Sequence, residues 1–114
     1  MNKYFRLAKK TALKGGGRRQ HRLGAVGIRY DGALVKARNL ANIHPEPHAH
    51  AEARIVKKMG RGGVIYVVRI LRNGSYALAR PCLKCQQLMI NHDIRRCYYS
   101  ISDNEYGVLV LGDK

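Results

Sequence analysis

HAHAE at residues 48–52 and PCLKC at residues 81–85 are the two stretches around which this chain is organised. Together they supply imidazoles, a carboxylate and two thiols. Cys82 and Cys85 are three residues apart, a spacing that places two side chains on one face of a helix turn. Thiolates and imidazoles are common ligands of Zn²⁺ in proteins. The two stretches therefore indicate a zinc site built from distant parts of the chain.

Spacing within the two stretches also predicts how helices would approach such a site. Pro81 favours the start of a helix, where its missing N–H costs nothing, and a helix N-terminus favours thiolate over thiol. His50 and Glu52 are two residues apart, so they point to different sides of a helix. They can meet one metal only if the helix directs its N-terminal end at the site. We expect two helices, beginning near His50 and near Cys82, whose N-termini converge.

The order H-x-E followed about thirty residues later by P-C-x-x-C resembles the signature of the zinc-dependent base deaminases. This resemblance implies that His50, Cys82 and Cys85 hold the zinc. A zinc with three protein ligands keeps a fourth position for water and lowers the pKa of that water to about 7. Glu52 is then expected to be the catalytic proton shuttle, passing a proton from the water to the ring nitrogen and to the departing ammonia.

A structural zinc site is the alternative interpretation of the same residues. It would need a fourth protein ligand, which His48 or Cys97 could supply. His50 has the signature's offset from Glu52, so we expect His48, like Pro81, to lie beside the ligands. Cys97 falls in an apolar strand pattern and is expected to be a buried, inert thiol.

Basic side chains dominate the composition. There are 22 Lys and Arg against 7 Asp and Glu, which gives a formal net charge of +15. Such an excess favours a polyanionic partner, for example single-stranded nucleic acid, or at least a ligand that carries phosphate.

Cysteine number and apolar patterning point to the compartment. No apolar run reaches the roughly 18 residues that a membrane span needs. The N-terminal 14 residues are basic but lack the continuous apolar segment of a signal peptide. Three cysteines, two of them in C-x-x-C, are too few for a disulfide scaffold and fit a reducing compartment. We expect a cytoplasmic protein without a membrane segment.

Hydrophobic periodicity and turn residues predict one domain, residues 1–114, with an N-terminal helix at about 3–14 and a catalytic core at about 20–111. Asn73-Gly74 indicates a hairpin turn. Only residues 102–105 join the last two strands, and a parallel crossover needs about a dozen residues or more, so these strands should be antiparallel. The expected strands are residues 23–29, 33–40, 64–71, 96–101 and 106–111, and further helices should follow His50 and Cys82.

The strand and helix order around the two motifs is similar to that of the cytidine deaminase-like superfamily over roughly residues 20–111. The resemblance implies an α/β fold, a three-layer α/β/α sandwich around a five-stranded mixed sheet. It also implies substrate contacts. In the tRNA adenosine and deoxycytidylate branches an asparagine precedes the histidine by about eleven residues, an offset held here by Asn39, with Asn42 as a nearby substitute. The end of the fourth strand usually helps hold the base. The implied substrate-binding residues are Asn39, Ala51, Tyr98, Tyr99 and Asp103, with the choice between the two tyrosines left open.

The resemblance is compatible with several substrates. The strand ending resembles deoxycytidylate-type and small phage deaminases, whereas Ala79-Arg80 replaces the Leu-Glu frequent in tRNA adenosine deaminases. An antiparallel last strand resembles the free-nucleoside enzymes, because the polynucleotide-editing branches insert a helix there. We expect a free cytidine or deoxycytidine nucleoside or nucleotide as substrate, and a homo-oligomer. The alternatives are cytosine or adenine within single-stranded DNA or RNA, including tRNA, and a non-catalytic basic zinc module that binds nucleic acid.

Overall fold

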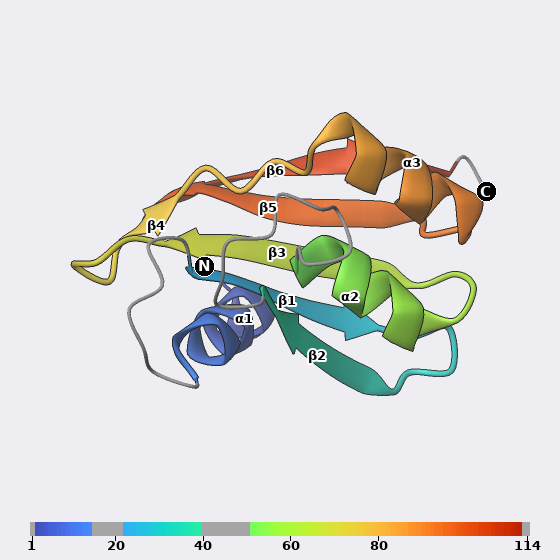
Figure 1. Ribbon diagram of the computed structural model, residues 1–114, viewed down its shortest axis with the longest axis horizontal. Coiled ribbons are helices and arrows are strands. Elements are labelled where there is room, and N and C mark those ends of the chain that lie inside the picture. Colours follow the sequence, from blue (N-terminus) through green and yellow to red (C-terminus); the bar gives the residue numbers. More distant parts are fainter. Residues whose placement is uncertain (1, 15–21, 40–50, 113–114) are drawn as a thin grey trace.

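The computed structural model describes residues 2–14, 22–39 and 51–112 and shows a mixed sheet covered by helices on both faces (Figure 1). Within these residues the sheet has six strands in the order β2-β1-β3-β5-β6, and the short β4 pairs with β3. The elements are α1 (Lys3–Leu13), β1 (Arg22–Ile28), β2 (Leu34–Arg38), α2 (Ala51–Met59), β3 (Val64–Ile70), β4 (Tyr76–Ala77), α3 (Leu83–Asn91), β5 (Arg96–Ser102) and β6 (Glu105–Val110).

Strand directions follow from the lengths of the connections. β1 pairs antiparallel with β2 and with β3, whereas β3 and β5, which are joined through α3, are parallel. β5 and β6 are antiparallel, which confirms the expectation drawn from their short link. The sheet has one strand more than the five expected, because the chain turns back at Asn73-Gly74 and pairs Ala77 with Arg69.

The sheet separates two apolar clusters, as a three-layer sandwich requires. On one face α2 and α3 contact each other and cover side chains such as Ile65, Val67 and Cys97. On the other face α1 packs Phe5 and Ala8 against Val26, Tyr66 and Val68. Both faces of β3 are thereby buried, in agreement with its nearly continuous apolar sequence. No helix in the described ranges combines the length and apolar character of a membrane-crossing segment.

α1 lies unusually close to β1 because the strand has a glycine at the contact. A Cβ added at Gly24 would overlap the carbonyl oxygen of Ala8 and lie 2.8 Å from the backbone nitrogen of Ala12. Both helix residues are themselves small and fully buried. The pair of alanines on α1 and the glycine on β1 therefore set the distance between helix and sheet.

Gly24→Ala should lower the free energy of unfolding by about 1–3 kcal/mol, because the added methyl group must push backbone atoms of α1 off the sheet. Chemical denaturation followed by circular dichroism measures the change. Gly112→Ala is the matched control, since the nearest atom to its added Cβ is 3.8 Å away. Equal stabilities of the two variants would contradict this account of the α1–β1 contact.

Candidate active site

The first candidate group is the carboxylate at the start of α2. Glu52 is the second residue of the helix as the structure has it, and only 5% of its surface is exposed. The same helix buries Ile55, Val56 and Met59 against the sheet, which explains why this segment docks with its apolar face inward. Ala51 at its first position is fully buried. Carboxylates are rarely buried to this extent unless they are paired with another group.

The second candidate group is the pair of thiols at the start of α3. Cys82 is the N-cap residue and is exposed, and Cys85 in the first turn is 1% exposed. Pro81 is buried directly before them, and its carbonyl oxygen accepts a hydrogen bond from Gln86 Nε2 at 2.9 Å. A hydrogen bond from Ala79 N to Ser100 O (2.9 Å) holds the approach to the helix against the end of β5.

The starts of the two helices lie close together, as expected from the spacing of the motifs. Burial raises the pKa of the Cys85 thiol, and the negative charge of Glu52 and a hydrogen bond with Cys82 raise it further. Burial also raises the pKa of Cys97, with smaller contributions from Glu52 and Cys85. One carboxylate and three thiols thus interact electrostatically at one place beneath α2 and α3.

The chemistry of this donor set fits a zinc ion. Thiols whose pKa is raised by burial and by a neighbouring carboxylate are groups that a divalent cation stabilises in their deprotonated form. Among residues 2–14, 22–39 and 51–112 no cluster of three or more His, Cys, Asp and Glu has metal-site geometry. His50, the expected third ligand, lies outside the described residues, as do His48 and Asn42.

The sheet places the two candidate tyrosines on opposite faces. Tyr99 is 8% exposed and belongs to the cluster under α2 and α3, together with Cys97, the thiol that interacts with Glu52 and Cys85. Tyr98 packs with the α1 layer, where its ring stacks on Tyr66 with centroids 4.7 Å apart. The structure thus brings Tyr99, and not Tyr98, to the face that carries the thiols.

Two further expected substrate contacts have partners within the protein. Asn39 follows β2, and its Oδ1 accepts a hydrogen bond from the backbone N–H of Leu23 at 3.0 Å. Its own N–H donates to the carbonyl of Leu23 at 3.1 Å, so the residue joins the end of β2 to β1. Asp103 follows β5, and its Oδ1 accepts from the backbone N–H of Tyr76 at 2.8 Å.

Arg80 is a candidate that the sequence analysis did not assign to the site. Its Nη1 donates to the Tyr99 hydroxyl at 3.2 Å, and its guanidinium lies 5.8 Å from the centre of the same ring. The residue directly precedes Pro81, and this adjacency was the available signal. Sequence spacing could not pair it with a tyrosine nineteen residues away.

Comparison with known proteins agrees with this arrangement. The family model described as the cytidine and deoxycytidylate deaminase zinc-binding region matches residues 1–101. The chain belongs to this family. Zinc-dependent deamination is a hydrolytic reaction, so the family is a family of hydrolases. The resemblance inferred from the two motifs is confirmed. No sequence among the curated proteins matches the chain.

Solved structures show that this deaminase-family chain has the fold of cytidine deaminases. The structure of cytidine deaminase from Burkholderia pseudomallei has a TM-score of 0.67 at 19% identity, over 98% of this chain and 94% of that one. The structure of cytidine deaminase from Mycobacterium tuberculosis has a TM-score of 0.52 at 20% identity, over 85% of this chain and 80% of that one. These likenesses confirm the predicted α/β fold class.

Proposed function

We propose that the protein is a zinc-dependent hydrolytic deaminase that converts the cytosine of a free cytidine or deoxycytidine nucleoside or nucleotide to uracil. The observation that carries the proposal is the buried carboxylate of Glu52 beside the buried thiol of Cys85, at the starts of two adjacent helices. A structural zinc site has no use for such a carboxylate, whereas hydrolytic deamination needs a group that moves protons next to the metal.

The proposed roles follow from the chemistry of each side chain. His50, Cys82 and Cys85 would hold the zinc, which when bound supplies the Lewis acidity that makes water a nucleophile near neutral pH. Glu52 would accept a proton from the attacking water and donate it to the ring nitrogen. Addition of water at C4 and loss of ammonia then give uracil. Burial of Glu52 excludes bulk water, which strengthens its electrostatic interaction with the reacting atoms.

We assign the substrate side of the site to a smaller group of residues. Tyr99 lies with Cys97 on the sheet face that α2 and α3 cover, so we place Tyr99 rather than Tyr98 at the base, with Arg80 holding its hydroxyl. Ala51 would line the pocket floor beside Glu52. Asn39 and Asp103 remain proposed contacts, and each would exchange a backbone partner for the substrate.

Two observations favour a free nucleoside or nucleotide over a polynucleotide as the molecule that reacts. The link between β5 and β6 consists of a two-residue turn, which leaves no room there for the inserted helix of the editing branches. β6 is antiparallel to β5, an arrangement similar to that of the free-nucleoside enzymes. The net charge of +15 favours the second candidate function, which is the same chemistry on a base in single-stranded DNA or RNA.

Ammonia release from the purified, zinc-loaded protein tests the proposal. The substrates are cytidine, deoxycytidine, their monophosphates, adenosine, guanine and a cytosine-containing single-stranded oligonucleotide. We expect turnover of at least one free cytosine compound and none with Glu52→Ala. Turnover of the oligonucleotide alone, lost steeply with added salt, would select the second candidate. Absence of turnover on every cytosine substrate would refute the proposal.

Cys97→Ala separates the catalytic site from a four-ligand structural site. Because we propose three protein ligands, the variant should retain its zinc and its activity. It should lose only about 1 kcal/mol of stability through the small cavity left by a fully buried side chain. Metal analysis after gel filtration and a denaturation curve measure the two effects. Loss of zinc would show that Cys97 is a ligand and would favour the structural interpretation.

A further inference from the structure

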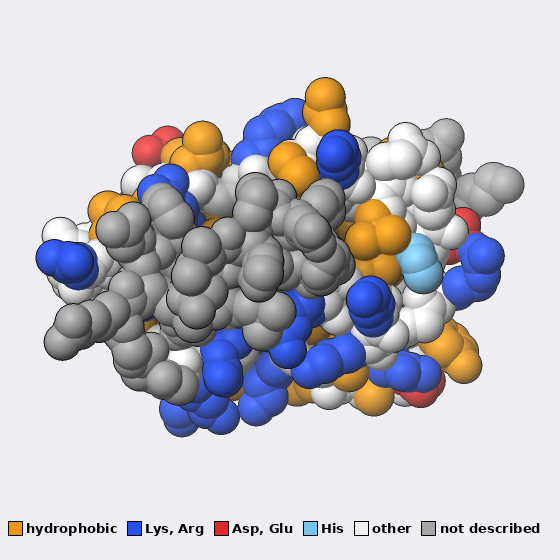
Figure 2. All heavy atoms as spheres, in the orientation of Figure 1, with side chains coloured by type: hydrophobic (Ala, Val, Ile, Leu, Met, Phe, Trp, Pro, Cys, Tyr) orange, Lys and Arg blue, Asp and Glu red, His pale blue; other side chains and the backbone are white. Residues whose placement is uncertain are grey.

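A basic groove lies on the side of α2 that faces away from α3. It has a volume of about 260 Å³ and runs between the C-terminal end of α1, the edge strand β2 and α2. Figure 2 shows Lys and Arg side chains gathered along the lower part of the molecule, over these three elements. Its described lining residues include five cations and no carboxylate: Thr11, Lys14, Lys36, Ala37, Arg38, Arg54 and Lys58.

The cations of α2 are held in place by the outer edge of β2. Lys58 Nζ donates to the carbonyl of Lys36 at 2.6 Å, and Arg54 Nη1 donates to the carbonyl of Arg38 at 2.7 Å. These contacts use exposed acceptors of the edge strand that would otherwise pair with water or another chain. An ammonium has three donors and a guanidinium five, so each cation keeps donors for a ligand. Little side-chain freedom remains to be lost on binding.

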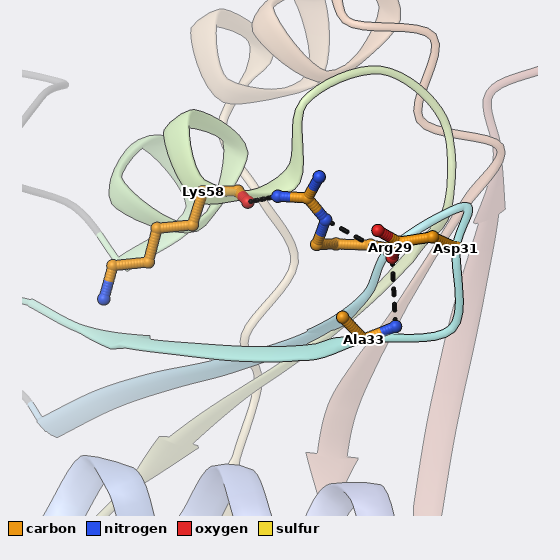
Figure 3. A network of polar contacts seen from close by, with 4 residues as sticks. All are labelled: Arg29, Asp31, Ala33 and Lys58. Atoms are coloured by element: carbon orange, nitrogen blue, oxygen red, sulfur yellow. Dashed lines mark hydrogen bonds and ion pairs between the residues drawn. The ribbon is translucent and has the colours of Figure 1, made fainter.

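A second network fixes the end of α2 and pairs Asp31 with Arg29. Arg29 Nη1 donates to the backbone carbonyl of Lys58 at 3.1 Å, and Arg29 Nε lies 3.4 Å from Asp31 Oδ1 (Figure 3). In this view the side chain of Lys58 extends away from Arg29, and Lys58 is one of the residues that line the groove. No ion pair within the described residues joins a carboxylate to Lys36, Arg38, Arg54 or Lys58.

The cations form two rows along the groove. Lys36 and Arg38 are two residues apart on β2, so their side chains lie about 7 Å apart on one face, which is the α1 face because Lys36 pairs with Val26 of the α1 cluster. Arg54 and Lys58 are one helical turn apart, with a separation of about 6 Å. The two rows therefore flank the edge of β2, with the strand row on the α1 side and the helix row on the α2 side. Two rows that repeat over this distance match a ligand with successive negative charges along an extended chain.

We infer that this groove binds the phosphate backbone of single-stranded nucleic acid. A groove along the edge of β2, with cations on both sides of that edge and no carboxylate among its described lining residues, complements an extended chain of phosphates. The described lining holds no aromatic ring on which a base could stack, so binding is tolerant of sequence and strongly dependent on salt. The inference goes beyond the proposed reaction. Arg54 is two residues from Glu52, roughly 200° around the helix, so the groove is separate from the thiols.

Binding of a fluorescent oligothymidylate to the zinc-loaded protein, followed by anisotropy over a range of salt concentrations, tests the inference. The ligand contains no cytosine, so the outcome is independent of the proposed deamination. The groove variant is Lys36→Gln with Arg38→Gln, which leaves both backbone carbonyls in place. Loss of two strand contacts should reduce the slope of log K against log salt by about 1.4 and weaken binding about tenfold in roughly 0.15 M salt.

Arg72→Gln with Arg95→Gln is the matched control, because it removes the same charge from exposed residues outside the groove lining. We expect its slope and affinity to stay close to those of the wild type. Equal losses in the two double variants would show that only overall charge matters and would overturn the inference. Failure of the wild type to bind at low salt would overturn it too. Displacement by inorganic phosphate at matched phosphate concentration, or equal affinity for a duplex, would likewise contradict it.

Discussion

Replacing Cys82 by alanine should release the zinc and reduce deamination to background while the fold remains. Cys82 is exposed at the N-cap of α3 and makes no capping hydrogen bond through its side chain, so the helix does not depend on the sulfur. The remaining two ligands, His50 and Cys85, are fewer than the three that a catalytic zinc site uses. Metal analysis should find about one zinc per wild-type chain and close to none in the variant.

Cys82→Ala should also change how the melting temperature responds to chelator, an effect that an activity assay would not reveal. A metal that binds only the folded protein stabilises it by about 4 kcal/mol at a thousand times its dissociation constant. Added chelator should therefore lower the melting temperature of the wild type and leave that of Cys82→Ala unchanged. Lys84→Ala is the control, because this exposed residue lies between the two cysteines on the same helix turn. Full zinc content in Cys82→Ala would contradict the proposed ligand set.

Glu52→Gln should lower the rate of deamination by about 10²–10⁴-fold, the range over which a positioned proton shuttle contributes. Glutamine keeps the size and most of the hydrogen-bonding capacity of the side chain, but it cannot take up the proton. The zinc content should stay at the wild-type level, since Glu52 is not a proposed ligand. Single-turnover rates and metal analysis on the same preparation measure both quantities.

A second readout separates catalysis from structure in this variant. The negative charge of Glu52 raises the pKa of Cys85, so its removal should lower the pKa of that thiol in the metal-free protein. The free energy of unfolding should not fall, because a buried charge is replaced by a neutral group of similar size. A rate within tenfold of the wild type, or loss of zinc, would contradict the role of Glu52 as proton shuttle.

Local sequence predicted much of the fold because its signals act over short distances. Apolar spacing and turn residues predicted the nine-residue helix that follows the Cys82 cap. The short link after β5 was sufficient to make the last strand pair antiparallel. β4 was not expected as a strand because it has only two residues, Tyr76 and Ala77, and therefore no alternating pattern. Its pairing depends on β3 and on a hydrogen bond from Ser100 Oγ to the Ala77 carbonyl (2.7 Å).

Some residues of the candidate site could likewise be predicted from the sequence, whereas others required the tertiary structure. Cys82 and Cys85 were proposed as ligands from residue type and spacing, since zinc accepts few kinds of side chain, and Glu52 was proposed from its place in the signature. Adjacent residues of a strand point to opposite faces, but which face meets the site depends on where helices pack. The choice of Tyr99 over Tyr98 therefore required the tertiary structure.

The sequence by itself determined the chemistry, the helix starts and the direction of the last strand, because each depends on residues within one turn or one link. Only the tertiary structure decided the partner of Arg80, the face of each tyrosine and the basic groove. In each of these, the interacting groups come from elements far apart in the chain, and the packing of helices on the sheet sets the distance between them. The net charge predicted a polyanion, but only the folded edge of β2 shows where its phosphates would lie.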